Sequence, residues 1–309
     1  MIPMGRRVTV QVPATSANLG PGFDTLGLAL AYYDQLEVAV REQPGATVEV
    51  TGYGSADSAV PVPTDESNLV VQAIAHAFEW AKQPMPGLNL RANNTIPHSR
   101  GMGSSSAAIV SGLLAAVGLL EGIVSFDEQT LLTLATDMEG HPDNVAPALF
   151  GGLTIAWMDD RGAHQKKLMV HRGVSPLVLV PSFTMSTKLA RSLQPEHVPH
   201  EDAIFNVSRS SLLVAALTQS PELLFEATED KLHQNYRAAA MPETHALITR
   251  LREAGFAAVV SGAGPSILVL CSDPSQRQAA IDVVRQHQDT VWEPHMLAVD
   301  FKGATVETH

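Results

Sequence analysis

The sequence predicts an α+β fold in two lobes. With 309 residues the chain is long enough for two domains or for one large two-lobed unit. Its predicted strands and helices are mixed without the strict strand–helix alternation of a doubly wound sheet. A polar stretch over residues 158–172 separates the two halves. We therefore place an N-terminal lobe at residues 1–160 and a C-terminal lobe at residues 161–309.

Hydrophobic periodicity predicts the elements of the first half. Alternation at Val8, Val10 and Val12 indicates a strand over residues 7–12. Residues 13–24 contain Pro, Gly, Asn and Ser, which is typical of a loop. Further strands are expected over residues 36–40, 47–51, 88–96 and 151–157. Helices are expected over residues 68–81, 107–120 and 127–138.

The second half follows the same mixed pattern. Strands are expected over residues 177–180, 257–260, 267–270 and 292–299, and helices over residues 186–193, 203–217, 242–254 and 276–286. The apolar runs 257–260 and 267–270 flank a Gly-rich segment and predict a strand–loop–strand hairpin. The single cysteine, Cys271, rules out an internal disulfide framework and a cysteine-cluster metal site. We expect it to be a small buried residue.

Charge and composition narrow the class of protein. The net charge is −12, with no dense Lys/Arg block, which disfavours a nucleic-acid or anionic-membrane partner. Apolar residues make up 45% of the chain and charged residues 17%, which favours a sizeable core over disorder. No apolar run approaches the length of a membrane span, and the N-terminus lacks a signal pattern. The sequence therefore predicts a soluble, cytoplasmic protein, in which an anionic substrate would need local positive groups.

A Gly/Ser segment at residues 97–108 connects a predicted strand to an apolar helix. The first turn of a helix has N–H groups without intrahelical partners, and the helix dipole adds positive charge there. Gly101 and Gly103 allow a bend and a close approach to the backbone, and the serines that follow supply hydroxyls. These features favour a phosphate-binding loop; the alternative is an ordinary loop with a serine N-cap. The loop is not a P-loop, because no lysine follows Gly103, and Ser106 replaces the third glycine of GxGxxG.

Three stretches, at residues 13–24 (PATSANLGPGFD), 97–108 and 261–266, together resemble the three motifs of the GHMP small-molecule kinases, in the same order. The run HPDNVAPALFGG at residues 141–152 is also similar to that family. The first run resembles the members that phosphorylate homoserine. The match covers nearly the whole chain. Met102 replaces the leucine that is usual in the family, a change that conserves volume.

The resemblance implies a fold, an activity and two cofactors. The fold would combine an N-terminal lobe like ribosomal protein S5 domain 2 with a ferredoxin-like C-terminal lobe. The activity would be transfer of the ATP γ-phosphoryl group to the side-chain hydroxyl of L-homoserine, in threonine biosynthesis. The resemblance places the ATP phosphates on Pro97, Ser99, Arg100, Gly101, Met102, Gly103, Ser104, Ser105 and Ser106.

The resemblance also implies a Mg²⁺ site and an adenine contact. Mg²⁺ would be bound by Ser105 and Glu139, since this ion prefers hard oxygen ligands. The alternative for Glu139 is a solvated charge at a helix end. Asn68 matches a family asparagine near the adenine, and its alternative role is a helix N-cap, which asparagine also favours.

The acceptor implied by the resemblance is a zwitterion, so its site needs groups of both charges. Asp24 and Asp143 match an ammonium site. Arg191 and Arg237 match a carboxylate site, because the arginine fork binds carboxylates in a bidentate manner. Further residues are expected to position the hydroxyl or to pack beside the substrate: Asn18, His141, Asn144, Gly262, and Thr187, which lies one helical turn before Arg191.

The chemistry of transfer is less defined by the sequence. The first motif has no lysine, and no general base is assigned. We expect direct in-line transfer, with Asp143 or Asn144 orienting the hydroxyl and His141 nearby, because phosphoryl transfer can depend largely on positioning and charge.

Two alternatives remain at this stage. One is another GHMP kinase, acting on mevalonate or shikimate, which would not need an ammonium partner such as Asp24. The other is a non-catalytic nucleotide-binding regulator, which should have lost Glu139 or the serines. A homodimer is left open.

Overall fold

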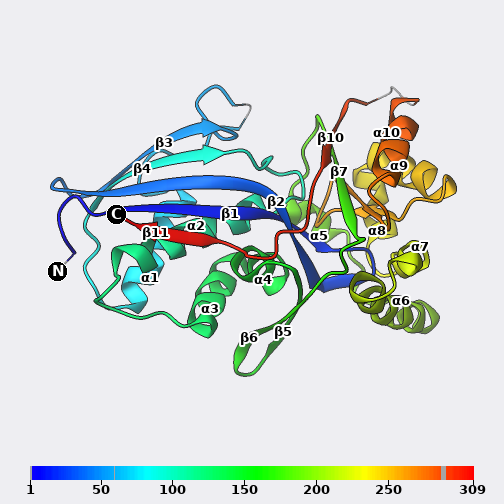
Figure 1. The fold of residues 1–309 in the computed structure, drawn as a ribbon, viewed down its shortest axis with the longest axis horizontal. Coiled ribbons are helices and arrows are strands. Elements are labelled where there is room, and N and C mark those ends of the chain that lie inside the picture. The colour runs from blue at the N-terminus through cyan, green and yellow to red at the C-terminus, as the bar shows by residue number, and fades with distance from the viewer. Residues whose placement is uncertain (1, 59, 287–289) are drawn as a thin grey trace.

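The computed structural model describes residues 2–58, 60–286 and 290–309, drawn in Figure 1. Within these residues the strands form two sheets, one in each half of the molecule as Figure 1 shows it. Buried apolar side chains form two core clusters. One covers the first sheet and its helices and continues onto one face of the second sheet at Val178 and Leu268, and the other lies on the opposite face of the second sheet. The predicted α+β architecture is confirmed.

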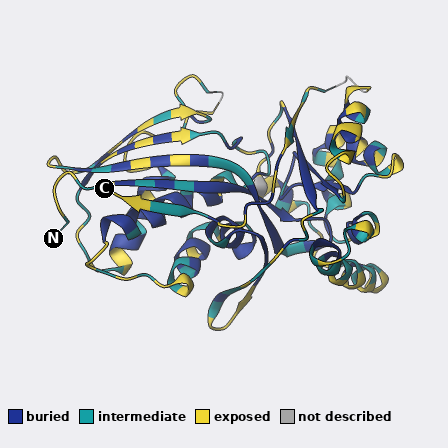
Figure 2. Ribbon diagram, viewed as in Figure 1, coloured by how far each residue is buried: buried dark blue, intermediate teal, exposed yellow. Residues whose placement is uncertain are grey.

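The first sheet carries helices on one face. Its strands follow the order β11 (Thr305–Thr308), β1 (Arg7–Asn18), β2 (Gly22–Arg41), β4 (Gly87–Asn94) and β3 (Ala46–Gly52), and β2 also pairs with the hairpin β5 (Leu153–Asp159) and β6 (Gly162–Leu168). The helices below this sheet in Figure 1 are α1 (Leu69–Trp80), α2 (Ser104–Leu119), α3 (Glu128–Glu139) and α4 (Pro142–Phe150). Along β2, Leu36 and Val38 are buried while Gln35 and Glu37 are exposed, so the opposite face is open to solvent (Figure 2).

The second sheet has the order β10 (Trp292–Met296), β7 (Ser175–Pro181), β9 (Ile267–Cys271) and β8 (Ala258–Val260). Around it lie α5 (Thr187–Ser192), α6 (His200–Thr218), α7 (Leu224–Ala227), α8 (Gln234–Arg237), α9 (Pro242–Glu253) and α10 (Gln276–Arg285), with short 3₁₀ turns at Pro221–Leu223 and Ala238–Ala240. The predicted hairpin is confirmed as β8 and β9. Cys271 is buried at the end of β9, and burial raises the pKa of its thiol to about 11, so it is the small buried residue expected.

The prediction of a loop over residues 13–24 was wrong for most of the segment, since only residues 19–21 lie outside strands. Strand β1 continues to Asn18, and β2 already begins at Gly22. Register shifts after Pro13 and after Ala17 bend this part of the strand pair. The residues between those shifts are small and buried on both faces, so they show no alternation that periodicity could detect.

Several other elements were also missed. Helix α4 begins with Pro142, which suits a first helical position, but Pro147 in its interior argued against a helix. The polar stretch that we took for a lobe boundary contains the end of β5, the turn at residues 160 and 161, and strand β6. Strand β11 returns from the end of the chain to pair with β1. The division of the chain into lobes at residues 1–160 and 161–309 stays a prediction.

Candidate active site

The three Gly-rich motifs meet where the two sheets adjoin. The backbone N–H of Thr15 in β1 donates to the Met102 carbonyl at 3.1 Å. The N–H of Gly262 donates to the Ala17 carbonyl at 3.1 Å. The hydroxyl of Ser261 donates to the Gly101 carbonyl at 2.6 Å. The end of β1, the loop before α2 and the loop between β8 and β9 are thus bonded into one unit.

The two glycines of the central loop are required by packing within the protein. Both have positive φ, 73° at Gly101 and 71° at Gly103. A Cβ atom at Gly101 would lie 2.1 Å from the Ser261 carbonyl oxygen, and one at Gly103 would lie 2.0 Å from Thr15 Oγ1. A side chain at either position would therefore separate the joined motifs.

The loop opens into the N-terminus of α2 as the sequence predicts. Gly103 is the N-cap residue and supplies no side-chain hydrogen bond to the first turn, which also contains no acidic residue. Ser104, Ser105 and Ser106 form that first turn. The N–H groups of a helix start in this form are suited to an anion.

Glu139 lies beside the same helix start. Its carboxylate accepts hydrogen bonds from Ser105 Oγ at 2.8 Å and from Ser106 Oγ at 2.9 Å. The structure thus brings Glu139 and Ser105 together, as expected from the sequence, and adds Ser106. All of the donor atoms are oxygen, the type that Mg²⁺ prefers.

Two cavities meet at the loop. The larger, of about 330 Å³, is lined by Val62, Pro63, Asn68 and Leu69. The smaller, of about 80 Å³, is polar. Ser99, Ser104 and Ser105 line both cavities. This arrangement fits a molecule with an extended, partly apolar body and an anionic end.

Asn68 fulfils the structural role that the sequence left open. It is the N-cap residue of α1, where its Oδ1 accepts from the Val70 N–H at 2.9 Å and its Nδ2 donates to the Pro63 carbonyl at 2.6 Å. It also lines the larger cavity. A contact of Asn68 with the adenine stays a prediction.

Asp34 anchors the chain just before the loop. Its Oδ1 accepts from the N–H groups of Thr95 at 2.7 Å and Ile96 at 2.8 Å. The carboxyl is buried, and burial raises its pKa from 3.8 to about 6 although these hydrogen bonds lower it. Sequence analysis did not identify this residue.

The raised pKa of Asp34 predicts a pH-dependent stability. The folded chain binds the Asp34 proton more tightly than the unfolded chain does. The protonated carboxyl therefore contributes its full share to the free energy of unfolding below pH 3.8, and this contribution is lost as the pH rises through about 6. We expect the free energy of unfolding of the wild type, measured with urea, to fall by about 2 kcal/mol relative to that of Asp34→Asn between pH 4.5 and 7.5. A difference that stays constant over this range would contradict the assignment.

The remaining predicted loop residues have their contacts within the protein. The Arg100 guanidinium donates to the carbonyls of Pro181 and Ser182, both at 3.0 Å, and to that of His98 at 3.2 Å, so it ties the loop to the end of β7. The side chain of Met102 is fully buried in the core, and Pro97 is buried. These residues shape the loop, whereas Ser99, Ser104 and Ser105 line the cavities.

Asp24 and Arg191 form an ion pair at the smaller cavity. Arg191 Nη1 donates to Asp24 Oδ2 at 3.1 Å and Nη2 to Oδ1 at 2.8 Å. The sequence assigned these residues to opposite ends of a zwitterion, and here they bind each other. The helix that carries Arg191 also contains Thr187, whose side chain lies outside the described part of the structure.

Arg237 lines the same cavity with unused hydrogen-bonding capacity. Its side chain is 2% exposed, and Nη1 has no partner among the described residues. Burial and then the charge of Arg191 lower its pKa to about 10, still well above neutral pH. A buried guanidinium of this kind favours an anionic group in the cavity.

His141, Asp143 and Asn144 converge at the start of α4. His141 Nδ1 and Asp143 Oδ1 form a hydrogen bond. Burial works against the charged imidazolium, but the hydrogen bond and charge of Asp143 outweigh it, and the pKa of His141 is raised. Asn144 Oδ1 accepts from Thr15 Oγ1 at 2.8 Å, and all three predicted residues line the smaller cavity.

Asn18 connects the first and third motifs. Its Nδ2 donates to the Gly262 carbonyl at 2.8 Å, and its Oδ1 accepts from the Asp24 N–H at 2.9 Å. Both Asn18 and Gly262 line the smaller cavity. The Asn18 amide therefore holds the position of Asp24.

Sequence reasoning missed residues that complete this cavity or support it, namely Thr15, Phe23 and Met185, whereas Ala263, which also lines the cavity, belongs to the third Gly-rich loop that was expected to pack beside the substrate. Thr15 and Phe23 lie inside the first motif, so that motif was the available signal for them. Met185 follows β7 and had no signal in the sequence. A groove of about 540 Å³ between α8, α9 and β8 is larger, but its described lining includes none of the predicted site residues.

Known proteins resemble this chain along almost its full length. Residues 68–152 match the model of the GHMP kinase N-terminal domain, and residues 212–290 match that of the GHMP kinase C-terminal domain. A homoserine kinase of Leifsonia xyli subsp. xyli is 72% identical over 98% of this chain and 92% of its own length. A homoserine kinase of Streptomyces coelicolor is 46% identical over 97% of this chain and 94% of its own. The crystal structure of a homoserine kinase from Cytophaga hutchinsonii superimposes with a TM-score of 0.85, at 26% identity and 97% coverage of each chain.

An α+β fold in which a helix N-terminus faces a cavity lined by charged and polar side chains, together with these matches, defines a small-molecule kinase. The chain belongs to the GHMP kinase family. Membership implies the use of ATP. In the described part of the chain, no helix has the length and apolar character needed to cross a membrane.

Proposed function

We propose that this chain transfers the γ-phosphoryl group of ATP to the side-chain hydroxyl of L-homoserine and forms O-phospho-L-homoserine. The observation that carries the proposal is the charge pattern of the smaller cavity. It combines the buried, partly unpartnered Arg237 and the Asp24–Arg191 pair with the Ser105–Glu139 contact at an anion-binding helix start. The relatives at 46% and 72% identity bear the name of this activity.

In the proposed complex, the nucleotide base occupies the larger cavity beside Asn68, and the phosphates lie against the N-terminus of α2. The two cavities share Ser99, Ser104 and Ser105, so the triphosphate passes from one into the other. The backbone N–H groups of the first turn of α2 bind phosphate oxygens and stabilise negative charge.

Ser105 and Glu139 would hold Mg²⁺, with Ser106 as their immediate neighbour. Their oxygen-only donor set suits this ion, which completes its coordination with phosphate oxygens and water. When bound, the ion would neutralise charge on the phosphates. Within the protein, the two serine hydroxyls keep the Glu139 carboxylate directed at the helix start.

The amino acid binds by both of its charged groups. Its carboxylate accepts a hydrogen bond from Arg237 Nη1, which is unpaired among the described residues, and a second one from Arg191. Its ammonium group pairs with Asp24, so that the zwitterion binds at the Asp24–Arg191 pair. Asp143 or Asn144 then orients the hydroxyl toward the γ-phosphate for in-line transfer, with His141 held against Asp143.

The other members of the family offer the competing function. Mevalonate and shikimate carry a carboxylate and no ammonium group, so they would leave Asp24 without a partner from the ligand. Structures of mevalonate kinases match this chain at 11% and 16% identity, which shows a common fold alone.

A comparison of substrates tests the proposal. We expect kcat/KM, measured as ADP release with Mg·ATP, to be highest for L-homoserine among L-homoserine, L-serine, mevalonate, shikimate and galactose. L-Serine should be at least about tenfold poorer, because its shorter chain places the hydroxyl away from the phosphate when the charged groups are bound. Fastest turnover of mevalonate, shikimate or galactose would contradict the proposal.

The setting of the enzyme follows from the same proposal. A small-molecule kinase of this type would act in the cytoplasm on a free amino acid. The net charge of −12 argues against a nucleic-acid partner. A homodimer stays an open expectation.

A further inference from the structure

The turn between β1 and β2 holds a strained backbone at the substrate end of the site. Asn18, Leu19 and Asp24 have φ values of 71°, 51° and 54°, and Gly20 has 89°. Left-handed conformations are unfavourable for residues other than glycine, more so for leucine than for asparagine or aspartate, and persist only where neighbouring groups enforce them. Asp24 is the third residue of β2, just after the turn, and its N–H donates to Asn18 Oδ1 at 2.9 Å, so the forces that hold the turn also place its carboxylate.

His233 supplies the bond that fixes the middle of the turn. Its ring is fully buried, and Nε2 lies 2.8 Å from the Gly20 carbonyl oxygen. Because that carbonyl can only accept, Nε2 carries the hydrogen. Nδ1 has no partner among the described residues, as expected for the unprotonated nitrogen of a neutral ring. Burial lowers the pKa of His233, which favours this neutral form.

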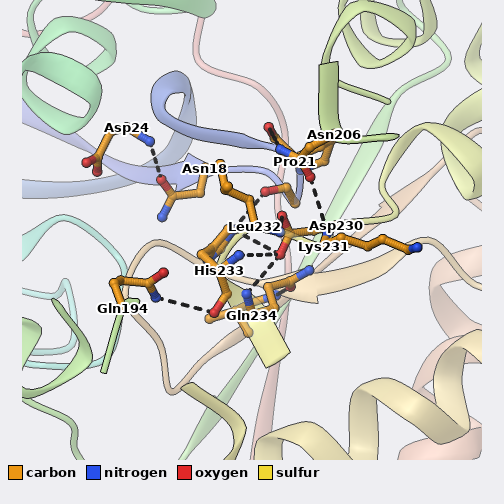
Figure 3. Close-up of polar contacts among 12 residues, drawn as sticks. Asn18, Pro21, Asp24, Gln194, Asn206, Asp230, Lys231, Leu232, His233 and Gln234 are labelled. Carbon is orange, nitrogen blue, oxygen red and sulfur yellow. Dashed lines mark hydrogen bonds and ion pairs between the residues drawn. The ribbon is translucent and has the colours of Figure 1, made fainter. Parts of the chain in front are cut away.

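The segment that carries His233 is itself held firmly. The buried Asp230 carboxylate accepts from the N–H groups of Leu232 at 2.9 Å, His233 at 3.1 Å and Gln234 at 2.8 Å (Figure 3). Asn206 in α6 joins this segment to the turn, since its Oδ1 accepts from the Lys231 N–H at 3.2 Å and its Nδ2 donates to the Pro21 carbonyl at 2.9 Å.

His233 also reaches the carboxylate-binding side of the cavity. Its ring stacks on Phe23 with centroids 4.8 Å apart and planes at 18°. The Arg237 guanidinium lies 5.1 Å from the centroid of the same Phe23 ring. His233 therefore contacts the β1–β2 turn directly, at Gly20, and supports Arg237 through Phe23.

From these contacts we propose that His233 is a positioning residue for the amino-acid substrate. As a neutral hydrogen-bond donor it holds the β1–β2 turn, and as a stacking partner it holds Phe23 under Arg237. Asp24 and Arg237 then face the two charged groups of the substrate in fixed positions. The inference rests on the proposed function, because it assigns these two residues to the ammonium and carboxylate ends of homoserine.

The test replaces the donor while keeping the buried volume. In His233→Leu we expect the KM for L-homoserine to rise about 10- to 100-fold, because the hydrogen bond that positions Asp24 is lost. The KM for ATP should change less than about twofold. The preference for L-homoserine over L-homoserinol should fall, because the Arg237 guanidinium is no longer held in position to bind the carboxylate. His233→Gln, whose Nε2 can donate to the Gly20 carbonyl, should recover most of the loss.

A second variant and a control keep the test decisive if His233→Leu folds poorly. Phe23→Leu removes the ring between His233 and Arg237, and we expect the same change in substrate preference with a smaller rise in KM. Ile281→Ala is the control, because Ile281 lies in α10 and in the second core cluster. This variant should lower stability without raising the KM for L-homoserine relative to the KM for ATP.

The outcomes separate this inference from the proposed function. An unchanged KM for L-homoserine in folded His233→Leu and Phe23→Leu variants would overturn the positioning role. An equal rise in the KM for L-homoserine and the KM for ATP would overturn it as well. Failure of the wild-type enzyme to phosphorylate L-homoserine would instead overturn the proposed function.

Discussion

Replacing Glu139 by glutamine is expected to lower kcat by about two to three powers of ten, with little change in the KM for L-homoserine. The substitution keeps the shape of the side chain and one acceptor for the hydroxyls of Ser105 and Ser106. It removes the negative charge of the proposed Mg²⁺ ligand. Because that charge acts on the phosphates and not on the amino acid, the loss should appear in turnover.

Glu128→Gln is the matched control for this experiment. It makes the same chemical change at the exposed start of the same helix, α3. Steady-state kinetics over a range of Mg²⁺ concentrations should show wild-type values for Glu128→Gln and a deficit in Glu139→Gln. Wild-type kcat in Glu139→Gln at saturating Mg²⁺ would remove Glu139 from the metal site.

Replacing Arg237 by methionine is expected to lower kcat/KM for L-homoserine by about one to two powers of ten. A hydrogen bond to a charged group contributes roughly 1.5–3 kcal/mol, and this arginine has a donor without a partner in the described structure. L-Homoserinol has a hydroxymethyl group in place of the carboxylate, so its kcat/KM should change much less. The ratio of the two substrates therefore measures the contact.

Arg209→Met is the control for Arg237→Met. Arg209 also lies over a phenylalanine ring, at 4.4 Å from the centroid of Phe205, but it pairs with Glu229 outside the site. We expect this variant to keep the wild-type preference for homoserine. If the preference is equally intact in folded Arg237→Met, the carboxylate is bound elsewhere. Arg191→Ala is the less direct test, since it also releases Asp24.

The sequence was sufficient where a local pattern was clear. Helix α1 has apolar residues at helical spacing, and the β8–β9 hairpin has two apolar runs on either side of a Gly-rich segment; both lie close to the predicted ranges. Strand β2 was predicted only over residues 36–40, because its first half is buried on both faces and does not alternate. Helix α4 was missed because Pro147 lies in its interior.

The site followed the same division between local and long-range information. The resemblance identified Ser105, Glu139 and Arg237, and the structure places all three at the smaller cavity. It could not indicate that Asp24 and Arg191 bind each other, because that contact joins residues 167 positions apart. Nor could it indicate that His233 reaches Gly20, a contact across 213 positions.

The most direct test of the central claim is to identify the phosphorylated product. Phosphorus NMR of the enzyme with Mg·ATP and L-homoserine should show the γ-phosphate signal replaced by ADP and one phosphomonoester in equal amounts. The phosphomonoester should couple to the terminal methylene protons of homoserine. Release of inorganic phosphate in place of the ester, or a phosphate on the carboxyl or amino group, would contradict phosphoryl transfer to the homoserine hydroxyl.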